Sequence, residues 1–431
     1  MNKTIKYPRF TVIIPQKDRA EYLFHTLRTC TLQDYPNFEV IVGDDCSEDN
    51  SIEVVKEFQK KDSRIRLIAH EHHVGMRENF ETALDEVQDG FVMALGGDDG
   101  LTPNAIWRMY ELIQQTGVEL LTWSQARYKY PMNEKDTGLF TVPRRVFSGV
   151  KMVKSSDYLN KIAHTMNYMT DDCPMFYVKG VASTELVKRV KQRTPDGKFY
   201  YCPTPDGYSG VVLAGEVDMY AYTKEPLTLA GDSPKSQGRV YHRADMKSRK
   251  EAQLFFDDNV GRSMHKDLAS QPYSPLITLM TADYLLTAHD LPGWPGKFEL
   301  FTPEHLIRAT FSFLSRNRFE SETLKREIII LREIAIQHNL LELFNELMQN
   351  TKRKTIKEIT PDGFLVTPNI FEFNGSMMGI HNIYDAALAT KFAYEAYNQF
   401  SIKFLFDWLK RSWKIFKNNH DYKTEKLPSI D

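Results

Sequence analysis

Short β-branched runs alternate with amphipathic stretches along the first 125 residues of this 431-residue chain. The runs that read as buried strands cover residues 10–15, 38–42, 64–69 and 91–95. The stretches with helical spacing of apolar residues cover residues 20–32, 51–61 and 77–87. Such alternation is typical of βα units. We therefore expect an α/β fold with a mixed, mostly parallel sheet flanked by helices.

Two pairs of adjacent carboxylates come shortly after expected strands. Asp44 and Asp45 follow residues 38–42, and Asp98 and Asp99 follow residues 91–95. The carboxyl ends of parallel strands meet at the sheet edge where open α/β folds bind ligands, so both pairs are expected at one site. Adjacent carboxylates repel each other unless a cation or hydrogen-bond donors compensate them. The pattern favours a ligand site, although Asp and Gly are also common in turns and helix caps.

The charge balance and the cysteines exclude several classes of protein. The 55 Lys and Arg residues against 57 Asp and Glu residues give a formal net charge of −2, which argues against a nucleic-acid partner. The four cysteines form neither CxxC nor a metal-knuckle spacing, so we expect reduced thiols. No run approaches the roughly 18 apolar residues of a membrane span, and the first residues carry no apolar secretion signal. We therefore expect the chain in the cytoplasm.

The sequence pattern predicts three parts. Residues 1–240 form the expected α/β domain, which ends near the breaker-rich stretch 231–238. Within it, residues 125–154 have weak patterning and predict a loop-rich connection or lid. Residues 241–395 are expected to form a mainly helical C-terminal domain that contacts the acceptor or a second copy of the chain. Residues 396–431 form an amphipathic helix and a tail.

The stretch 400–417 combines aromatic and basic residues. On a wheel of 100° per residue, Ile402, Leu405, Leu409, Trp413 and Phe416 share one arc, and lysines and an arginine occupy the other. This arrangement is typical of a helix that lies in the membrane interface. A helix that packs its apolar arc on its own domain gives the same pattern, so both interpretations stay open.

Several motifs in this order resemble the family 2 glycosyltransferases. The opening TVIIPQKDRAEYL is similar to the first strand and turn of that family, and IVGDDCSEDNS is similar to its second strand. The segment from HHVGMRENF to LGGDDGLTPNAI follows the family's helix start, strand and carboxylate motif. The likeness is strong over residues 10–125 and weaker to about residue 230. It implies the GT-A fold and a nucleotide-sugar donor.

The resemblance assigns donor-binding roles to particular residues. Asp45 would accept a hydrogen bond from the nucleotide base, which favours UDP, and Asp44 would support it. Asp98 would contact the ribose or a metal-bound water, and Asp99 would hold Mg²⁺ or Mn²⁺, ions that suit oxygen ligands and a diphosphate. The remaining implied contacts are Pro15, Asp18 and Arg19 near base and ribose, and Arg77 near the diphosphate.

Family 2 enzymes are inverting, so the resemblance also implies one carboxylate that deprotonates the acceptor hydroxyl. Asp206, in the segment YCPTPDGY, lies about where the family has its base and precedes a glycine at an expected helix start. The rivals are Asp171 with Asp172, and Glu216 or Asp218. Asp206 as a simple helix N-cap is the structural alternative.

The chain also departs from the family pattern. Gln16, Lys17 and Asp18 replace the usual Thr-Tyr-Asn, the carboxylate motif reads Gly97-Asp98-Asp99, and the QxxRW motif of processive synthases is absent. A single sugar addition is therefore favoured over polymer synthesis. Lys235, Arg239 and His242 could close over the diphosphate, or they are simply solvated.

The resulting hypothesis is an inverting, metal-dependent transferase that moves a sugar from a nucleotide-sugar to a hydroxyl of a glycan or lipid-linked acceptor in cell-surface polysaccharide synthesis. It would work in the cytoplasm or peripherally on the inner face of the membrane. The alternative is a non-catalytic nucleotide-sugar-binding or scaffolding subunit, which would need no base. A dinucleotide-dependent oxidoreductase is disfavoured because no GxGxxG follows the first strand.

Overall fold

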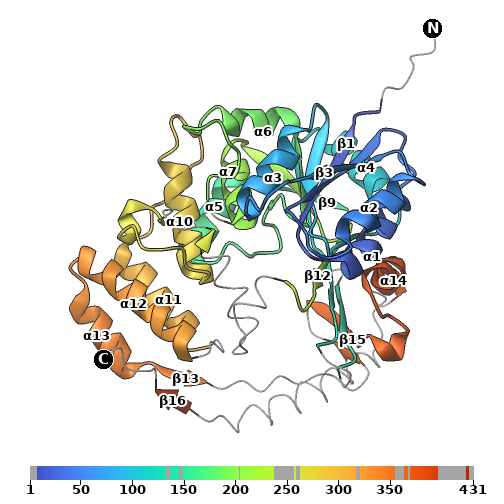
Figure 1. Cartoon of the computed structure of the whole chain (residues 1–431). Helices are drawn as coiled ribbons and strands as arrows, with labels where there is room; N and C mark the ends of the chain where they lie inside the picture. The colour runs from blue at the N-terminus through green and yellow to red at the C-terminus, as the bar shows by residue number, and fades with distance from the viewer. Residues whose placement is uncertain are drawn as a thin grey trace.

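A computed structural model describes residues 7–132, 136–144, 149–202, 204–236, 257–258, 263–316, 321–354, 364–366, 369–396 and 424–426. The expected βα units are confirmed at the N-terminus (Figure 1). Their elements are β1 (Phe10–Gln16), α1 (Ala20–Thr31), β2 (Phe38–Asp44), α2 (Ser51–Gln59), β3 (Ile65–Ala69), α3 (Met76–Asp85) and β4 (Phe91–Ala94). β1 pairs in parallel with β2 and β4, and β2 pairs in parallel with β3.

The main sheet has eight strands in the order β3-β2-β1-β4-β10-β6-β11-β9. The added strands are β6 (Leu120–Trp123), β9 (Val150–Lys154), β10 (Gly180–Ser183) and β11 (Met219–Thr223). β10 runs antiparallel to both β4 and β6, so the sheet is mixed. This matches the expected fold class.

Helices cover both faces of the main sheet. Val12 and Ile14 of β1 pack in one core with α1, α2 and α4 (Ala105–Thr116), whereas Ile13 packs in a second core on the other face. That second core contains α3, α5 (Ser155–Thr165), α6 (Thr184–Lys191) and α7 (Pro205–Gly215). Successive strand residues point to opposite faces, which is why β1 is buried along its whole length.

The stretch 125–154 is not the loop-rich connection that the sequence predicts. It forms β7 (Ala126–Lys129), β8 (Leu139–Pro143) and β9. β7 and β8 join a second sheet in the order β14-β15-β8-β7-β12-β5, with β5 (Gly100–Leu101), β12 (Thr228–Asp232), β14 (Phe364–Val366) and β15 (Ile370–Asn374). The prediction was wrong because partners more than 100 residues away stabilise these short strands, and local patterning does not record such partners.

Residues 241–395 do not pack as one helical unit in the part of the chain that the structure describes. α10 (Ile277–His289) packs on one side in the core that contains α7. On its other side it packs with α11 (Pro303–Leu314), α12 (Ser321–Gln337) and α13 (Leu341–Asn350) in a separate core. α14 (Ile383–Ala396) returns to the N-terminal part and lies against α1 (Figure 1). The shorter elements are η1 (Lys266–Leu268), η2 (Ser376–Met378), β13 (Lys352–Lys354) and β16 (Thr424–Lys426).

The helices in the described ranges include none with the length and hydropathy to cross a bilayer. The stretch 400–417, with its aromatic and basic arcs, lies outside the described residues.

Candidate active site

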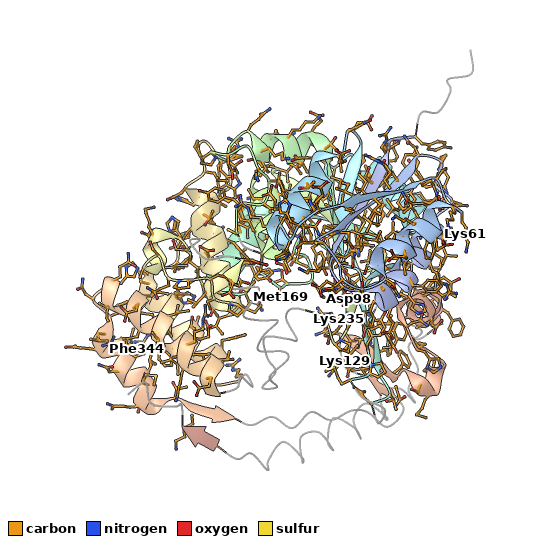
Figure 2. All side chains as sticks on the ribbon, in the orientation of Figure 1. Lys61, Asp98, Lys129, Met169, Lys235 and Phe344 are labelled. Atoms are coloured by element: carbon orange, nitrogen blue, oxygen red, sulfur yellow. The ribbon has the colours of Figure 1, made fainter. Side chains whose placement is uncertain are left out.

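The two carboxylate pairs meet at the carboxyl edge of the parallel strands. Gln16 at the end of β1 pairs with Asp44 at the end of β2, and β4 ends at Ala94, just before the loop that carries Asp98 and Asp99. All four carboxylate residues are buried. The structure therefore brings together the two motifs that the sequence places on one edge, and Figure 2 shows Asp98 there beside Lys235.

Asp98 is fully engaged by side chains of this chain. Its Oδ1 accepts a hydrogen bond from Arg19 at 2.5 Å. Its Oδ2 accepts hydrogen bonds from the hydroxyls of Ser233 at 2.7 Å and Ser236 at 2.6 Å. Arg19 also donates to the carbonyl of Lys235. Asp98 therefore fastens the segment after β12 to the first strand loop, and a ribose would have to share or replace these contacts.

Asp99 carries the charge that Arg19 leaves uncompensated. Its two oxygens accept backbone hydrogen bonds from Gly96 at 2.6 Å and Gly231 at 2.8 Å. Burial and the neighbouring charge of Asp98 raise the pKa of Asp99 to about 7. One guanidinium thus faces two buried carboxylates, an arrangement that a cation would complete.

The residues present fit a hard divalent ion held by carboxylate oxygens. Asp99, with Asp98 beside it, would hold Mg²⁺ or Mn²⁺. The described residues contain no group of three or more His, Cys, Asp or Glu side chains that could hold a metal ion. The remaining ligands would therefore come from the diphosphate and from water, as is common for Mg²⁺.

Asp45 directly follows β2, and its side chain contacts the N-terminus of α3. Its carboxylate accepts backbone hydrogen bonds from Val74 at 2.7 Å and Gly75 at 3.2 Å. His73 contacts Asp45 through Nδ1 at 2.8 Å and Asp258 through Nε2 at 2.9 Å. Asp45 is thus held in place by the residues before α3 and contacts the imidazole of His73.

The other residues assigned to base and ribose shape the loops around Asp45. Asp44 accepts hydrogen bonds from Gln16 and from the backbone and hydroxyl of Ser47, and burial raises its pKa. Asp18, at φ 52°, accepts a hydrogen bond from the backbone of Glu48 at 2.7 Å. Pro15 is buried within β1. Asp44 and Asp18 therefore fix the loop between β2 and α2.

The side chain of Arg77 contacts the segment that leads into α7. Its Nε donates to the carbonyl of Tyr200, and its guanidinium pairs with Asp196 at 3.0 Å. The guanidinium thus holds the segment before α7, and the role near the diphosphate that the family resemblance implies stays a prediction. Arg77 is the second residue of α3, and its contacts are to the 196–201 segment, which is remote in sequence.

Asp206 lies in the first turn of α7. Its Oδ1 is shielded from solvent and accepts no hydrogen bond, although the residue as a whole is partly exposed. Burial raises the pKa of Asp206. Thr204, the N-cap of α7, makes no side-chain cap and instead shares a hydrogen bond with Tyr284. The backbone amides of Asp206 and Gly207 stabilise the ionised carboxylate, and both lower its pKa. A buried oxygen that accepts no hydrogen bond is nevertheless costly, and such groups concentrate at functional sites.

Three of the four rival carboxylates are held in ion pairs, and the fourth is exposed. Asp171 pairs with Lys224, and Asp172 pairs with Lys161 at 2.5 Å. Burial by itself would raise the pKa of Asp172, but the hydrogen bonds from Lys161 and Thr170 outweigh this effect and lower the pKa below its ordinary value. Glu216 pairs with Arg193 at the far end of α7, and Asp218 is exposed. In the described part of the chain, Asp206 is the carboxylate whose buried oxygen lacks a hydrogen bond.

Comparison with known proteins identifies the domain that carries this site. Residues 11–179 match the sequence model of "Glycosyl transferase family 2". This stretch is a family 2 glycosyltransferase domain.

Similar proteins cover only part of this chain and are themselves covered only in part. The putative teichuronic acid biosynthesis glycosyltransferase TuaG of Bacillus subtilis is 27% identical over 108 residues, which are 25% of this chain and 43% of that protein. The GalNAc(5)-diNAcBac-PP-undecaprenol beta-1,3-glucosyltransferase of Campylobacter jejuni is 33% identical over 100 residues, 23% of this chain and 32% of that protein. The chain thus spans less than half the length of these two relatives.

A solved structure extends over more of the chain. Residues 1–349 of Staphylococcus aureus TarS, in complex with UDP-GlcNAc, superpose with a TM-score of 0.45 and 15% sequence identity. The superposition covers 83% of this chain and 96% of that one.

Two serines of the candidate site carry no signal in the sequence. Ser233 and Ser236 contact Asp98 across more than 130 residues, and a polar, breaker-rich loop does not specify that contact. Lys235 contacts the carbonyl of Asp18. Of the three basic residues considered for a lid, Arg239 and His242 lie outside the described residues.

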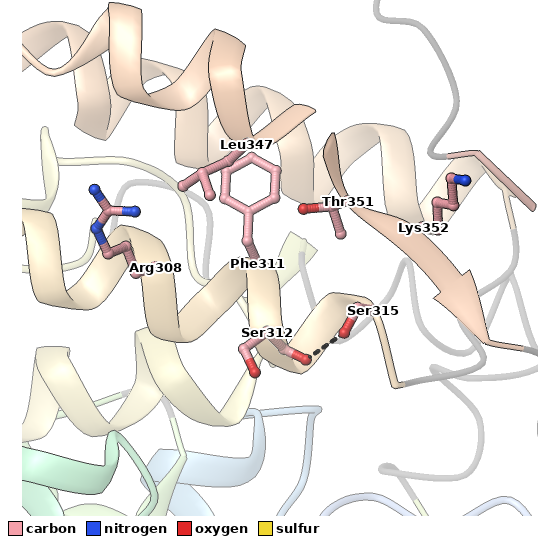
Figure 3. A pocket seen from close by; sticks show the side chains of 7 residues that line it. All are labelled: Arg308, Phe311, Ser312, Ser315, Leu347, Thr351 and Lys352. Carbon is pink, nitrogen blue, oxygen red and sulfur yellow. Dashed lines mark hydrogen bonds between the residues drawn. The ribbon is translucent and has the colours of Figure 1, made fainter. Parts of the chain in front are cut away.

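A cavity of about 330 Å³ lies between α11 and α13 (Figure 3). Its lining consists of Arg308, Phe311, Ser312, Ser315, Leu347, Thr351 and Lys352. These residues include no carboxylate, and Figure 2 shows Phe344 of the same helical group far from Asp98. The cavity is therefore not the donor site.

Proposed function

We propose that this protein is an inverting glycosyltransferase that transfers a sugar from a nucleotide-sugar, with UDP as the favoured nucleotide, to a hydroxyl of a glycan or lipid-linked acceptor. The observation that carries the proposal is the buried Asp98–Asp99 pair at the carboxyl edge of β4, of which Arg19 compensates only one charge. Such a pair suits a ligand that consists of a diphosphate and its metal ion. The pair lies within the stretch that matches family 2.

In this proposal, donor binding uses the sheet edge. Asp45, fixed by the backbone of Val74 and Gly75, accepts a hydrogen bond from the base, with Asp44, Asp18 and Pro15 shaping the loop around it. Asp98 binds the ribose after its contacts with Ser233 and Ser236 rearrange. When bound at Asp99, Mg²⁺ or Mn²⁺ would neutralise charge on the departing nucleoside diphosphate.

Asp206 is the proposed catalytic base. Its ionised Oδ1 takes the proton of the acceptor hydroxyl, whose oxygen attacks the anomeric carbon opposite the diphosphate. The bond from that carbon to the diphosphate breaks in the same step, so one displacement inverts the configuration. The absent partner of Oδ1 supports this role, because the oxygen is free to accept a proton from a ligand.

The names of relatives support the proposed acceptor class. One relative is named a glucosyltransferase for a diphosphoundecaprenol-linked GlcNAc, and another is named for teichuronic acid biosynthesis. A lipid-linked acceptor would place the protein at the inner face of the membrane, with residues 400–417 as the proposed contact. A flotation assay with anionic vesicles tests this contact by comparing the full chain with a chain that ends at residue 396. We expect only the full chain to float with the vesicles.

A thermal-shift titration tests the donor site without knowledge of the acceptor. The protein is titrated with UDP, GDP, CDP and dTDP, each with and without Mn²⁺. Binding to the native state raises the midpoint by mass action. We expect a metal-dependent shift with one diphosphate, its loss in Asp99→Ala, and its retention in Asp89→Ala, which changes a 73% exposed carboxylate. The absence of a shift with all four diphosphates would refute the proposal.

Turnover distinguishes an enzyme from a binding subunit. Release of the nucleoside diphosphate is measured with a panel of nucleotide-sugars and lipid-linked acceptors. Transfer that is lost in Asp206→Asn, with nucleotide binding intact, is the expected result. Nucleotide binding without any transfer would favour the non-catalytic alternative.

A further inference from the structure

Helix α3 holds the segment that leads into α7. The side chain of Glu81 on α3 is 1% exposed, and its two oxygens accept hydrogen bonds from consecutive backbone amides. Oε1 accepts from Phe199 at 3.0 Å, and Oε2 accepts from Tyr200 at 2.9 Å. Hydrogen bonds to an ionised acceptor are roughly twice as strong as neutral ones. Glu81 therefore fixes the position of this backbone.

Further contacts make the attachment rigid. Lys191 compensates the buried charge of Glu81 at 2.8 Å. Arg77 donates to the carbonyl of Tyr200, so both polar groups of that residue's backbone are bound by α3. The Tyr200 ring packs edge-on against Phe80 of the same helix at 5.4 Å between ring centres.

The same helix begins at the nucleotide side of the site. Gly75 is the N-cap of α3, and the amides of Val74 and Gly75 donate to Asp45. α3 and α7 share one core on one face of the main sheet (Figure 1). α3 thus contacts the carboxylate assigned to the base of the donor and, through Glu81, the segment that ends at Asp206.

We propose that Glu81 is a positioning residue that sets the location of Asp206 relative to the donor. This inference rests on the proposed function, because it assumes that Asp206 is the catalytic base. Asp206 follows Tyr200 by only six residues, so a displacement of the Tyr200 backbone is passed to the first turn of α7. A misplacement of about 1 Å at a reacting group can cost about 10²-fold in rate.

The variant Glu81→Gln tests the proposal. An amide has one oxygen, so one of the two backbone amides loses its acceptor while the side-chain volume is kept. We expect kcat to fall ten- to a hundred-fold, with the KM for the donor and the affinity for the nucleoside diphosphate unchanged within two-fold. A purely structural role would lower thermal stability and the active fraction but leave kcat per folded enzyme unchanged.

Glu216→Gln is the matched control. Glu216 is also buried, pairs with Arg193, and lies at the opposite end of α7. We expect this variant to lose thermal stability as Glu81→Gln does but to keep kcat. An unchanged kcat in Glu81→Gln, or an equal loss in both variants, would overturn the proposal.

Hydrogen exchange gives a readout that does not depend on transfer. In Glu81→Gln, amides from residue 199 through the first turn of α7 should exchange faster than in the wild type, and in Glu216→Gln they should not. Unchanged exchange in Glu81→Gln refutes the positioning role even if the enzyme is active. Faster exchange in a protein without transferase activity would instead show that the attachment exists and that the proposed function is wrong.

Discussion

Replacement of Asp206 by asparagine should lower activity and raise stability at the same time. A positioned general base contributes about 10²–10⁴-fold, which corresponds to about 3–5 kcal/mol of transition-state stabilisation. Three of the rival carboxylates, Asp171, Asp172 and Glu216, are held in ion pairs, and the fourth, Asp218, is exposed. We therefore expect kcat of the Asp206→Asn variant to fall by about 10²–10⁴-fold.

The sign of the stability change follows from burial. Burial raises the pKa of Asp206 in the folded protein above its ordinary value. Below the unfolded-state pKa, the carboxyl group is protonated in both the folded and the unfolded protein, so its ionisation takes away no stability. Stability is then lost as pH rises through the raised folded-state pKa. The neutral amide of the Asp206→Asn variant avoids this loss because it does not ionise. The variant should be more stable than the wild type near neutral pH, with the difference vanishing toward pH 4.

Two measurements check this expectation. Initial rates of nucleoside diphosphate release give kcat from pH 5 to 8, and the wild-type rate should rise with pH as Asp206 ionises. Thermal midpoints over the same range give the stability difference. Asp218→Asn, which changes an exposed carboxylate, is the control. A variant that keeps more than a tenth of the wild-type kcat, or that is less stable at pH 7, would contradict the reasoning.

Three further predictions concern stability and binding. Asp283 is buried in α10, and burial raises its pKa to about 6. The Asp283→Asn variant should therefore be more stable than the wild type by up to about 3 kcal/mol at pH 8 and equally stable near pH 4. Urea unfolding at the two pH values measures this difference. Gly231→Ala would put a Cβ 1.8 Å from the carbonyl oxygen of Asp98; we expect a loss of about 1–3 kcal/mol and weaker nucleotide binding, and an unchanged midpoint with full binding would show that this close approach is not needed. Removal of divalent ions by a chelator should abolish the nucleotide-induced thermal shift of the wild type, and its persistence would argue against a metal at Asp99.

Local patterns were sufficient for the N-terminal βα units and for the location of both carboxylate pairs. Strand and helix periodicity is a property of a few consecutive residues, so the positions of β1 to β4 could be predicted. The prediction failed for residues 125–154, where β7 and β8 are short and depend on β12 and β15. The sequence likewise predicted a mainly helical region over residues 241–395, which contains α11 to α13, but gave no indication that α14 packs on α1.

The candidate site divides in the same way. The residue types and their order predicted Asp44, Asp45, Asp98 and Asp99 at one sheet edge, because parallel strands must end together. The partners of these carboxylates come from Arg19, Ser233 and Ser236, which only the tertiary structure brings to Asp98.

The sequence by itself determined the class of fold and the chemistry available at the edge of the sheet, since both follow from local periodicity and residue type. Only the tertiary structure decided that Arg77 and Glu81 hold the segment before α7, and that Asp206 has a buried oxygen without a partner. The physical reason is that hydrogen bonding and burial of a side chain depend on segments that are distant along the chain. Their arrangement is fixed by the packing of whole elements.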